Sequence, residues 1–182
     1  MHWHNQLTTR IAFFAFALFF LPCCSGVFQD TPAKSGGQIG ISLEKIEICR
    51  QVGGYGVYEP FVIKRFFAGR ENPVLVYAEI ENFKHVPRED GEYEVRLEHT
   101  IELFDAAGQA VVWRSGPESM VDVSRNKRRD FFIVKRIDLP QHLPVGGYQL
   151  TVRVADKHSG FICEQTMHDI QIVEGQGLVG VR

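Results

Sequence analysis

The residues best suited to covalent chemistry in this sequence lie near Cys163. His158, His168 and Asp169 are close to it in the chain, and a cysteine beside a histidine and a carboxylate can act as an activated nucleophile. His168 lies an odd number of residues from Cys163, however, so in a regular strand the two side chains point to opposite faces. A Cys-dependent hydrolase therefore stands third among three functional hypotheses.

The sequence contains seven histidines, which raises the question of a zinc site. It has no His-Glu-x-x-His motif and no closely spaced set of His and Cys, the patterns that zinc sites use. His99 falls on the apolar side of a predicted strand, where we expect a neutral, hydrogen-bonded core histidine. We predict no metal and no cofactor.

A dense basic run, RNKRRD, occupies residues 125–130 and supplies Arg125, Lys127, Arg128 and Arg129. Between two predicted strands it should form a cationic hairpin tip. Such a tip could bind phosphate or an anionic envelope polymer, or it could be a solvated turn that protects a sheet edge from aggregation. The net charge of the whole chain is only -2, which gives no reason to expect nucleic acid as a partner.

The preferred candidate surface lies in the segment CRQVGGYGVYEPF, which combines glycines with Tyr55, Tyr58 and Phe61. Glycines allow a mobile backbone, and aromatic rings offer a surface for stacking, so the combination suits contact with a peptide or a glycan. It lacks the Gly-Lys-Ser/Thr spacing of a phosphate-binding loop. The alternative is that these aromatic rings cap one end of the domain.

The amino-terminal residues have the pattern of an export signal. A polar start with Arg10 is followed by the apolar run IAFFAFALFFLP and then by small residues, as in a secretory signal peptide. The run is shorter than the roughly 20 residues that a membrane-spanning helix requires. We predict a signal peptide at residues 1–26, a flexible tether at 27–38, the folded domain at 39–174 and a loose tail at 175–182. The protein should be periplasmic, anchored at the outer membrane or extracellular.

Two forms of amino-terminal processing remain open. Leu21 and Cys24, followed by Ser25, resemble the signal of bacterial lipoproteins and imply lipidation of Cys24. The alternative is ordinary cleavage after Gly26. In an oxidising compartment the two remaining thiols, Cys49 and Cys163, would usually pair. We expect a disulfide between them, with two separate buried thiols as the alternative.

The elements that must position these residues are strands. From Tyr93 to Leu103 apolar residues alternate with polar ones, and the same period of two recurs in GGYQLTVRVAD, so each strand has one core face and one water face. Tyr148, Leu150, Val152 and Val154 form the inward set of the second strand, and FICEQTMHDIQIV follows as its partner with a bulge. About eight short strands and few helical patterns predict an all-β fold, an antiparallel immunoglobulin-like β-sandwich.

The segment LPVGGYQLTVRVAD resembles a hairpin common in immunoglobulin-like and fibronectin-type modules of secreted bacterial proteins. FDAAGQAVVWRS is similar to a segment of BsuPI-like proteinase inhibitor domains, which are also β-sandwiches, and LVYAEIENF resembles strands in envelope proteins of planctomycete-type bacteria. These resemblances imply an architecture, and they transfer no catalytic residue because such sandwiches host unrelated functions.

The sequence thus favours an exported, non-catalytic binding or structural module of the cell envelope. Its partner would be an envelope protein, a peptide or a glycan, with a lipid anchor at the membrane if Cys24 is modified. A BsuPI-like protease inhibitor that acts by loop insertion is the second hypothesis, and we expect no enzymatic activity.

Overall fold

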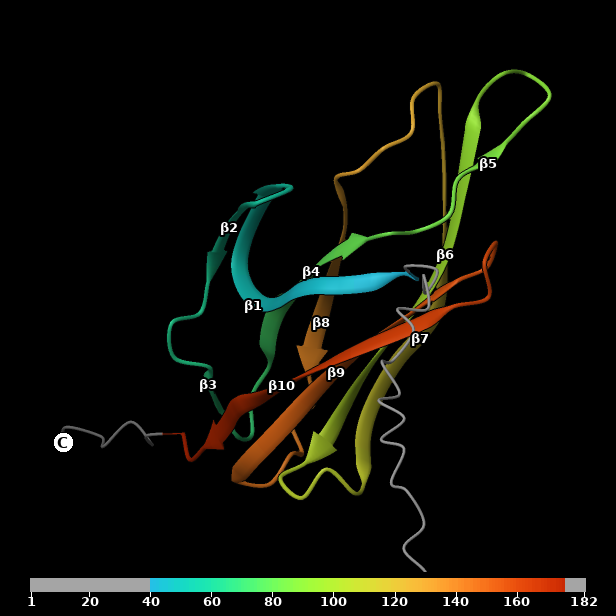
Figure 1. Ribbon diagram of the computed structural model, residues 1–182. Coiled ribbons are helices and arrows are strands. Elements are labelled where there is room, and N and C mark those ends of the chain that lie inside the picture. Colours follow the sequence, from blue (N-terminus) through green and yellow to red (C-terminus); the bar gives the residue numbers. More distant parts are fainter. Residues whose placement is uncertain (1–39, 176–182) are drawn as a thin grey trace, which may run out of the picture. The chain divides into compact units, whose positions relative to one another are not determined.

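The computed structural model describes residues 40–175 of the chain, which belong to one compact unit, Gln38–Arg182. These residues form ten strands and no helix, so the all-β prediction is confirmed for them (Figure 1). The described residues accordingly contain no helix able to cross a membrane. The predicted signal peptide, the tether, Cys24 and residues 176–182 lie outside the described residues.

One sheet, sheet A, contains four strands in the spatial order β2-β1-β4-β8, all antiparallel to their neighbours. The bounds are Val57–Pro60 for β2, Ser42–Gly54 for β1, Asn72–Glu81 for β4 and Phe131–Leu139 for β8. β4 lies inside the sheet, because it pairs with β1 on one side and with β8 on the other.

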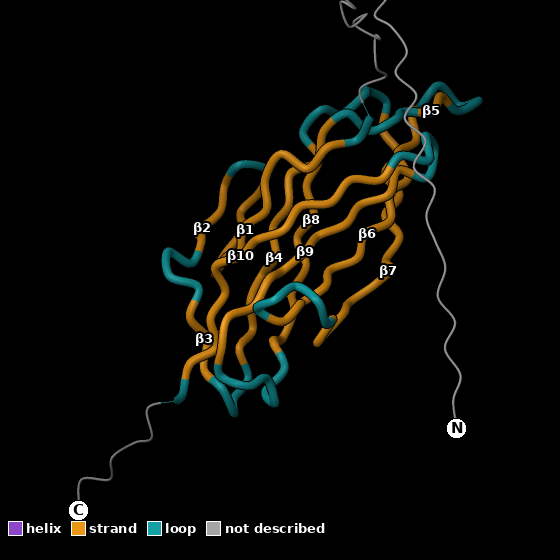
Figure 2. Tube along the Cα trace, turned by 60° about the horizontal axis from the view of Figure 1, so that its bottom comes forward, coloured by secondary structure: helices purple, strands orange, loops and turns teal. Residues whose placement is uncertain are grey.

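The second sheet, sheet B, has the order β3-β10-β9-β6, and both β7 and the short β5 pair with β6. Only the pairing of β3 with β10 is parallel among the described strands. The bounds are Arg65–Phe67 for β3, Ile162–Val173 for β10, Gly146–Asp156 for β9, Tyr93–Asp105 for β6, Val111–Ser124 for β7 and Val86–Pro87 for β5. Figure 2 shows the strands of the two sheets running in a similar direction.

The core forms where the apolar faces of the two sheets meet. The inward positions predicted for the strand that starts at Tyr93 are buried from Val95 to Leu103, and so are all four inward positions of β9. Together with alternate residues of β4 and β8 they make one continuous cluster. Thr151 lies on the opposite face of β9 and is also buried, because its hydroxyl is 2.8 Å from that of Thr166 on β10.

A single long strand runs through Gly116. Residues on both sides of Gly116 belong to β7, which bulges between its pairing with His99 and its pairing with Ile101. A Cβ at Gly116 would lie 2.7 Å from the backbone oxygen of His99, so glycine is required where the bulged backbone approaches β6 this closely. The bulge predicted in the last strand is confirmed between Met167 and Ile170.

The basic run at residues 125–130 was expected to form a hairpin tip, and this prediction is wrong. β7 pairs with β6 in sheet B, whereas β8 pairs with β4 in sheet A. The run therefore connects the two sheets instead of joining neighbouring strands of one sheet. Lys135 of β8 bonds Glu118 of β7 at 2.5 Å, which links the two sheets across the gap that this connection spans.

The start of β10 and the start of β1 lie side by side. The ring of Phe161 packs on Gly40, where a Cβ would lie 3.1 Å from the ring's Cγ. Further along, the Nζ of Lys64 lies 2.8 Å from Asp169 of β10 and 3.9 Å from Glu47 of β1. The two strands thus advance together in the same direction.

This arrangement separates the two cysteines, so the expected disulfide is absent and both thiols are free. Cys163 lies two residues past Phe161, beside the start of β1, whereas Cys49 lies near the far end of that contact. At about 3.3 Å per residue the two are on the order of 20 Å apart. A disulfide requires Cα atoms within about 7 Å of each other.

Candidate functional site

The glycine and aromatic segment folds over the outer face of sheet A. β1 is irregular after Cys49 and again after Val52, and the hairpin that it forms with β2 turns at Gly56, whose φ is +68°. The Tyr58 ring lies 4.5 Å from the ring of Tyr77 on β4. Tyr55 meets Phe132 of β8 edge to face at 6.3 Å. Both tyrosines predicted as ligand contacts therefore pack against the domain itself.

Tyr77 is the centre of the aromatic cluster that these rings form on the outer face of sheet A. It alternates with the core residues Val76 and Ala78, so it points away from the core, and yet its side chain is fully buried. Its hydroxyl accepts a hydrogen bond from the backbone N–H of Gly56 and donates one to Glu79, each at 2.7 Å. Burial raises the pKa of Tyr77 to about 12. The phenol is thus neutral and structural at physiological pH.

Phe61, the third predicted contact, is also occupied by packing. Its ring meets that of Phe66 at 5.4 Å, and the guanidinium of Arg50 lies 5.0 Å above it. The exposed side chains are the two that follow, since Val62 is 92% exposed and Ile63 is 64% exposed. Sequence reasoning missed this pair, although two adjacent aliphatic residues in a connecting segment break the period-two pattern.

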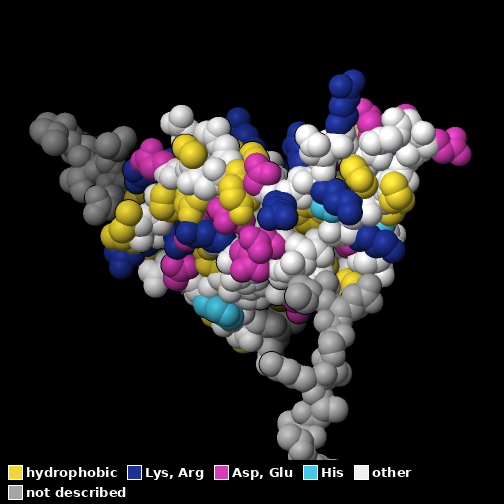
Figure 3. Space-filling view, turned by 45° about the horizontal axis from the view of Figure 1, so that its top comes forward, with side chains coloured by type: hydrophobic (Ala, Val, Ile, Leu, Met, Phe, Trp, Pro, Cys, Tyr) yellow, Lys and Arg dark blue, Asp and Glu magenta, His cyan; other side chains and the backbone are white. Residues whose placement is uncertain are grey.

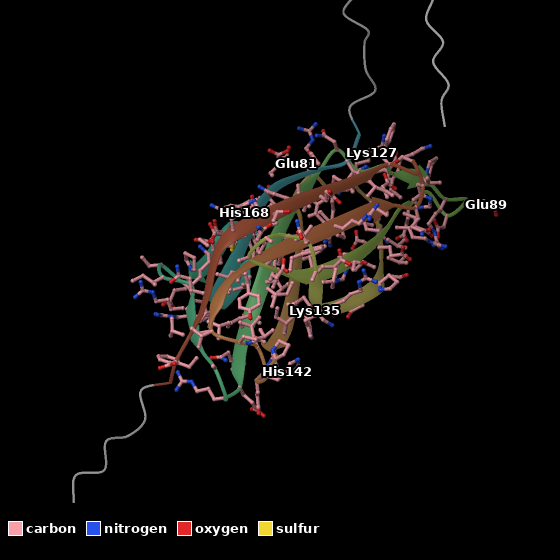
Figure 4. All side chains as sticks on the ribbon, turned by 90° about the horizontal axis from the view of Figure 1, so that it is seen from below. Glu81, Glu89, Lys127, Lys135, His142 and His168 are labelled. Carbon is pink, nitrogen blue, oxygen red and sulfur yellow. The ribbon has the colours of Figure 1, made fainter. Side chains whose placement is uncertain are left out.

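The basic connection, by contrast, borders open space. Arg128 and Arg129 line a hollow of about 290 Å³ with the last residue of β4, Glu81, and with Asn82, Phe83 and His85 after it. Figure 3 shows Lys and Arg side chains gathered close to a histidine on the face seen there. In Figure 4, Glu81 and Lys127 lie toward the end of the domain that carries Glu89 and the β5–β6 connection.

The four predicted cations differ in their partners. Arg128 pairs with Asp122 at 3.4 Å, and the Nζ of Lys127 lies 5.2 Å from the centre of the Tyr93 ring. Within the described part of the chain, Arg125 and Arg129 have no ion-pair partner. Of these two, only Arg129 lines the hollow, so its charge is the one most available to a bound anion.

The aromatic floor of this hollow is fixed by the core. Phe83 is buried, with its ring 5.2 Å from that of Phe131 and 5.0 Å from that of His85. Burial lowers the pKa of His85. The contacts of Phe83 with Phe131 and His85 fix the floor in place. The hollow is therefore a formed feature of the fold.

The cysteines lack the environment of nucleophiles. Burial raises the pKa of Cys49 and that of Cys163 to about 11, so few thiolates exist at neutral pH. Cys163 packs against the core, whereas His168 lies exposed in the bulge of β10 (Figure 4). The bulge does not bring the two side chains to one face.

Within residues 40–175, no group of three or more His, Cys, Asp or Glu side chains is arranged to hold a metal ion. His99 is buried in β6, and this burial lowers its pKa, so its imidazole is neutral at pH 7. No family model matches this chain, and no curated protein matches it. A function for this protein must therefore be inferred from the geometry of its surfaces.

Proposed function

We propose that this protein is an exported, non-catalytic binding module of the cell envelope, built as an immunoglobulin-like β-sandwich. The observation that carries the proposal is the hollow between Arg128, Arg129 and the aromatic floor of Phe83 and His85. Its partner would present an anionic group, as a carboxylated or phosphorylated envelope protein, peptide or glycan does. The tyrosine surface is a weaker candidate, since its rings are engaged with Tyr77 and Phe132.

The order of the long strands supports the immunoglobulin-like assignment. With the short strands set aside, β1-β4-β8 and β10-β9-β6-β7 follow the order A-B-E and G-F-C-C′ of immunoglobulin-type domains. The hydroxyl of Tyr148, near the start of β9, donates to the backbone oxygen of Pro144 at 2.7 Å. This bond resembles the tyrosine corner, which in such domains lies at the start of strand F.

The location in the envelope is supported by the sequence alone. The apolar run before Cys24 and the polar segment after it have the pattern of an export signal and a tether. Intact-mass measurement on protein from the envelope fraction tests this part. A chain that begins after Cys23 or Gly26 is expected, and a diacylglyceryl mass lost in Cys24→Ala selects the lipoprotein. Envelope protein that retains Met1 would contradict export by a cleaved signal.

Binding to anionic polymers tests the site. We expect the protein to bind immobilised polyphosphate or polyglutamate, and Arg129→Glu to abolish most of that binding while leaving the fold intact, because no ion pair is lost. Arg125→Glu is the matched control, since Arg125 is also exposed, has no ion-pair partner in the described part of the chain and does not line the hollow. Equal losses for both variants would show a general charge effect, and unchanged binding by Arg129→Glu would refute the site.

A BsuPI-like protease inhibitor remains the alternative function. The exposed pair Val62 and Ile63 in the β2–β3 connection favours it, because inhibition by loop insertion needs side chains that project from a rigid frame. Incubation with a panel of serine and cysteine proteases separates this function from the first. A Cys163-dependent hydrolase has less support, given the raised pKa of that thiol, and a Cys163→Ser comparison on ester substrates tests it.

A further inference from the structure

The β2–β3 connection presents two adjacent aliphatic side chains to solvent on a fixed backbone. We call Val62 and Ile63 the apolar tip. The residue before the tip is held by a hydrogen bond from the N–H of Phe61 to the oxygen of Ile48 at 2.9 Å. The residue after it, Lys64, accepts a hydrogen bond from the N–H of Gln171 at 2.9 Å. Exposure of the tip is therefore built into the fold.

Side-chain contacts hold the same two ends. Phe61 and Phe66 meet edge to face, and Phe66 is buried in the core. The ammonium of Lys64 bonds Asp169 at 2.8 Å while its own side chain is largely covered. Because both ends are fixed, docking of the tip would cost little conformational entropy. Hydrophobic side chains gather with Lys and Arg at the end that carries β2 and β3 in Figure 3.

A hollow with two arginines lies on sheet A, and one of them, Arg50, reaches the residue that precedes the tip. The hollow has a volume of about 300 Å³ and is lined by Arg50, Arg136 and the start of β4. Arg50 stacks on Phe61, the residue next to the tip. Both side chains of its ion pair with Glu59, at 3.4 Å, are 60% exposed, so the pair contributes little and can exchange for another anion. Arg136 has no ion-pair partner among the described residues.

We propose that the apolar tip inserts into a lipid bilayer while Arg50 and Arg136 bind the phosphates of the headgroups. A lipid surface suits a projecting pair of aliphatic side chains because it needs no complementary pocket. Arginines beside an apolar wedge match the charge of anionic headgroups and leave the aliphatic groups to enter the acyl boundary. This role is independent of the anion site at Arg129 and rests on the proposed location in the envelope.

Tryptophan fluorescence of the full chain tests insertion. Val62→Trp places a reporter on the tip, and Val121→Trp places one on β7, where Val121 is 56% exposed. Trp113, together with Trp3 where the export signal is retained, is common to both variants, so its emission cancels in the comparison. With vesicles of phosphatidylethanolamine and phosphatidylglycerol, we expect emission to shift to shorter wavelength in Val62→Trp and to stay unchanged in Val121→Trp.

The arginines are tested in the same reporter. Arg50→Ala and Arg136→Ala should each raise the lipid concentration needed for half of the shift by about fivefold, as expected for one basic residue near an anionic surface. Phosphatidylcholine vesicles should give a weaker response than anionic ones. Circular dichroism verifies that each variant is folded.

Equal spectra for Val62→Trp and Val121→Trp in the presence of vesicles would overturn the proposal. The tip would then be a contact for a protein, as an inhibitor loop requires. A shift that does not respond to either arginine substitution would refute the headgroup site. Arg129→Glu should leave the shift unchanged, so failure of the polymer-binding site and failure of lipid insertion are separate results.

Discussion

Replacing Tyr58 by alanine should destabilise the protein, although Tyr58 lies outside the core between the sheets. Its ring covers Tyr77 at 4.5 Å, and the Nζ of Lys45 lies 5.1 Å from the centre of the same ring. A tyrosine buries about 150 to 250 Å² when fully covered, and Tyr58 is mostly covered. Losing roughly 100 Å² at about 25 cal/mol per Å² costs about 2.5 kcal/mol.

Two further effects act in the same direction. The substitution removes the cation–π contact of Lys45, worth about 0.5 to 1 kcal/mol at an exposed site. It also opens a path for water to Tyr77, whose hydroxyl holds the turn at Gly56. We therefore expect a loss of about 3 kcal/mol in the free energy of unfolding.

Urea denaturation followed by circular dichroism measures this loss. With a denaturant dependence of about 2 kcal/mol per M, the midpoint should fall by about 1.5 M. Val62→Ala is the matched control, because Val62 is almost fully exposed and should change stability by less than about 0.5 kcal/mol. If Tyr58→Ala and Val62→Ala have the same midpoint, the outer aromatic layer does not stabilise the fold and Tyr58 returns as a candidate ligand contact.

Three further predictions concern the interior. Burial acts to raise the pKa of Asp156, but hydrogen bonds from Ser159, from the Lys84 backbone and from residues of its own turn lower it below its ordinary value. The stabilisation is thus present above the unfolded-state pKa and lost on acidification below about pH 4; Asp156→Asn should flatten the acid limb of a stability-versus-pH curve. Leu97→Asp should cost several kcal/mol by thermal melting, whereas Glu98→Ala, on the water face, should cost little; equal losses would mean that the faces are misassigned. A thiol reagent should modify Cys49 only after unfolding, and fast modification in the native protein would contradict its burial.

The sequence was sufficient to predict the strands whose apolar face lines the core. In β6 and β9 the alternation of apolar and polar residues is strict, so burial follows directly from the pattern. Thr151 is the exception, and it became buried through Thr166, a cross-strand neighbour that a period of two cannot identify. The order of strands was less accessible, because alternation tells which face of a strand is buried but not which strand lies beside it. For that reason the sequence predicts a hairpin at residues 125–130, where the structure has a connection between the two sheets.

The candidate surfaces were harder to predict for a related reason. Tyr55 and Tyr58 carry the residue types of a binding surface, and only the irregular end of β1 brings them over Tyr77. The apolar tip was missed because its two side chains belong to no periodic pattern. Composition alone could single out the glycine and aromatic segment. Which of its side chains pack and which face solvent depends on how the β1–β2 hairpin folds back over sheet A.

The two candidate surfaces, the basic hollow and the apolar tip, lie toward opposite ends of β4. This separation affects how the protein would be oriented at a membrane. Glu81, at one end, lines the basic hollow, and Pro73, at the other, lines the hollow beside the tip. Both residues belong to β4, and their separation along the strand places them about 26 Å apart. The described chain starts at the end with the basic hollow, where Asn82 bonds Ser42. Residues 25–39 can span at most about 50 Å, so a lipid at Cys24 would still permit the tip to reach the same bilayer. In that orientation the basic hollow would face away from the membrane, toward a partner in the envelope.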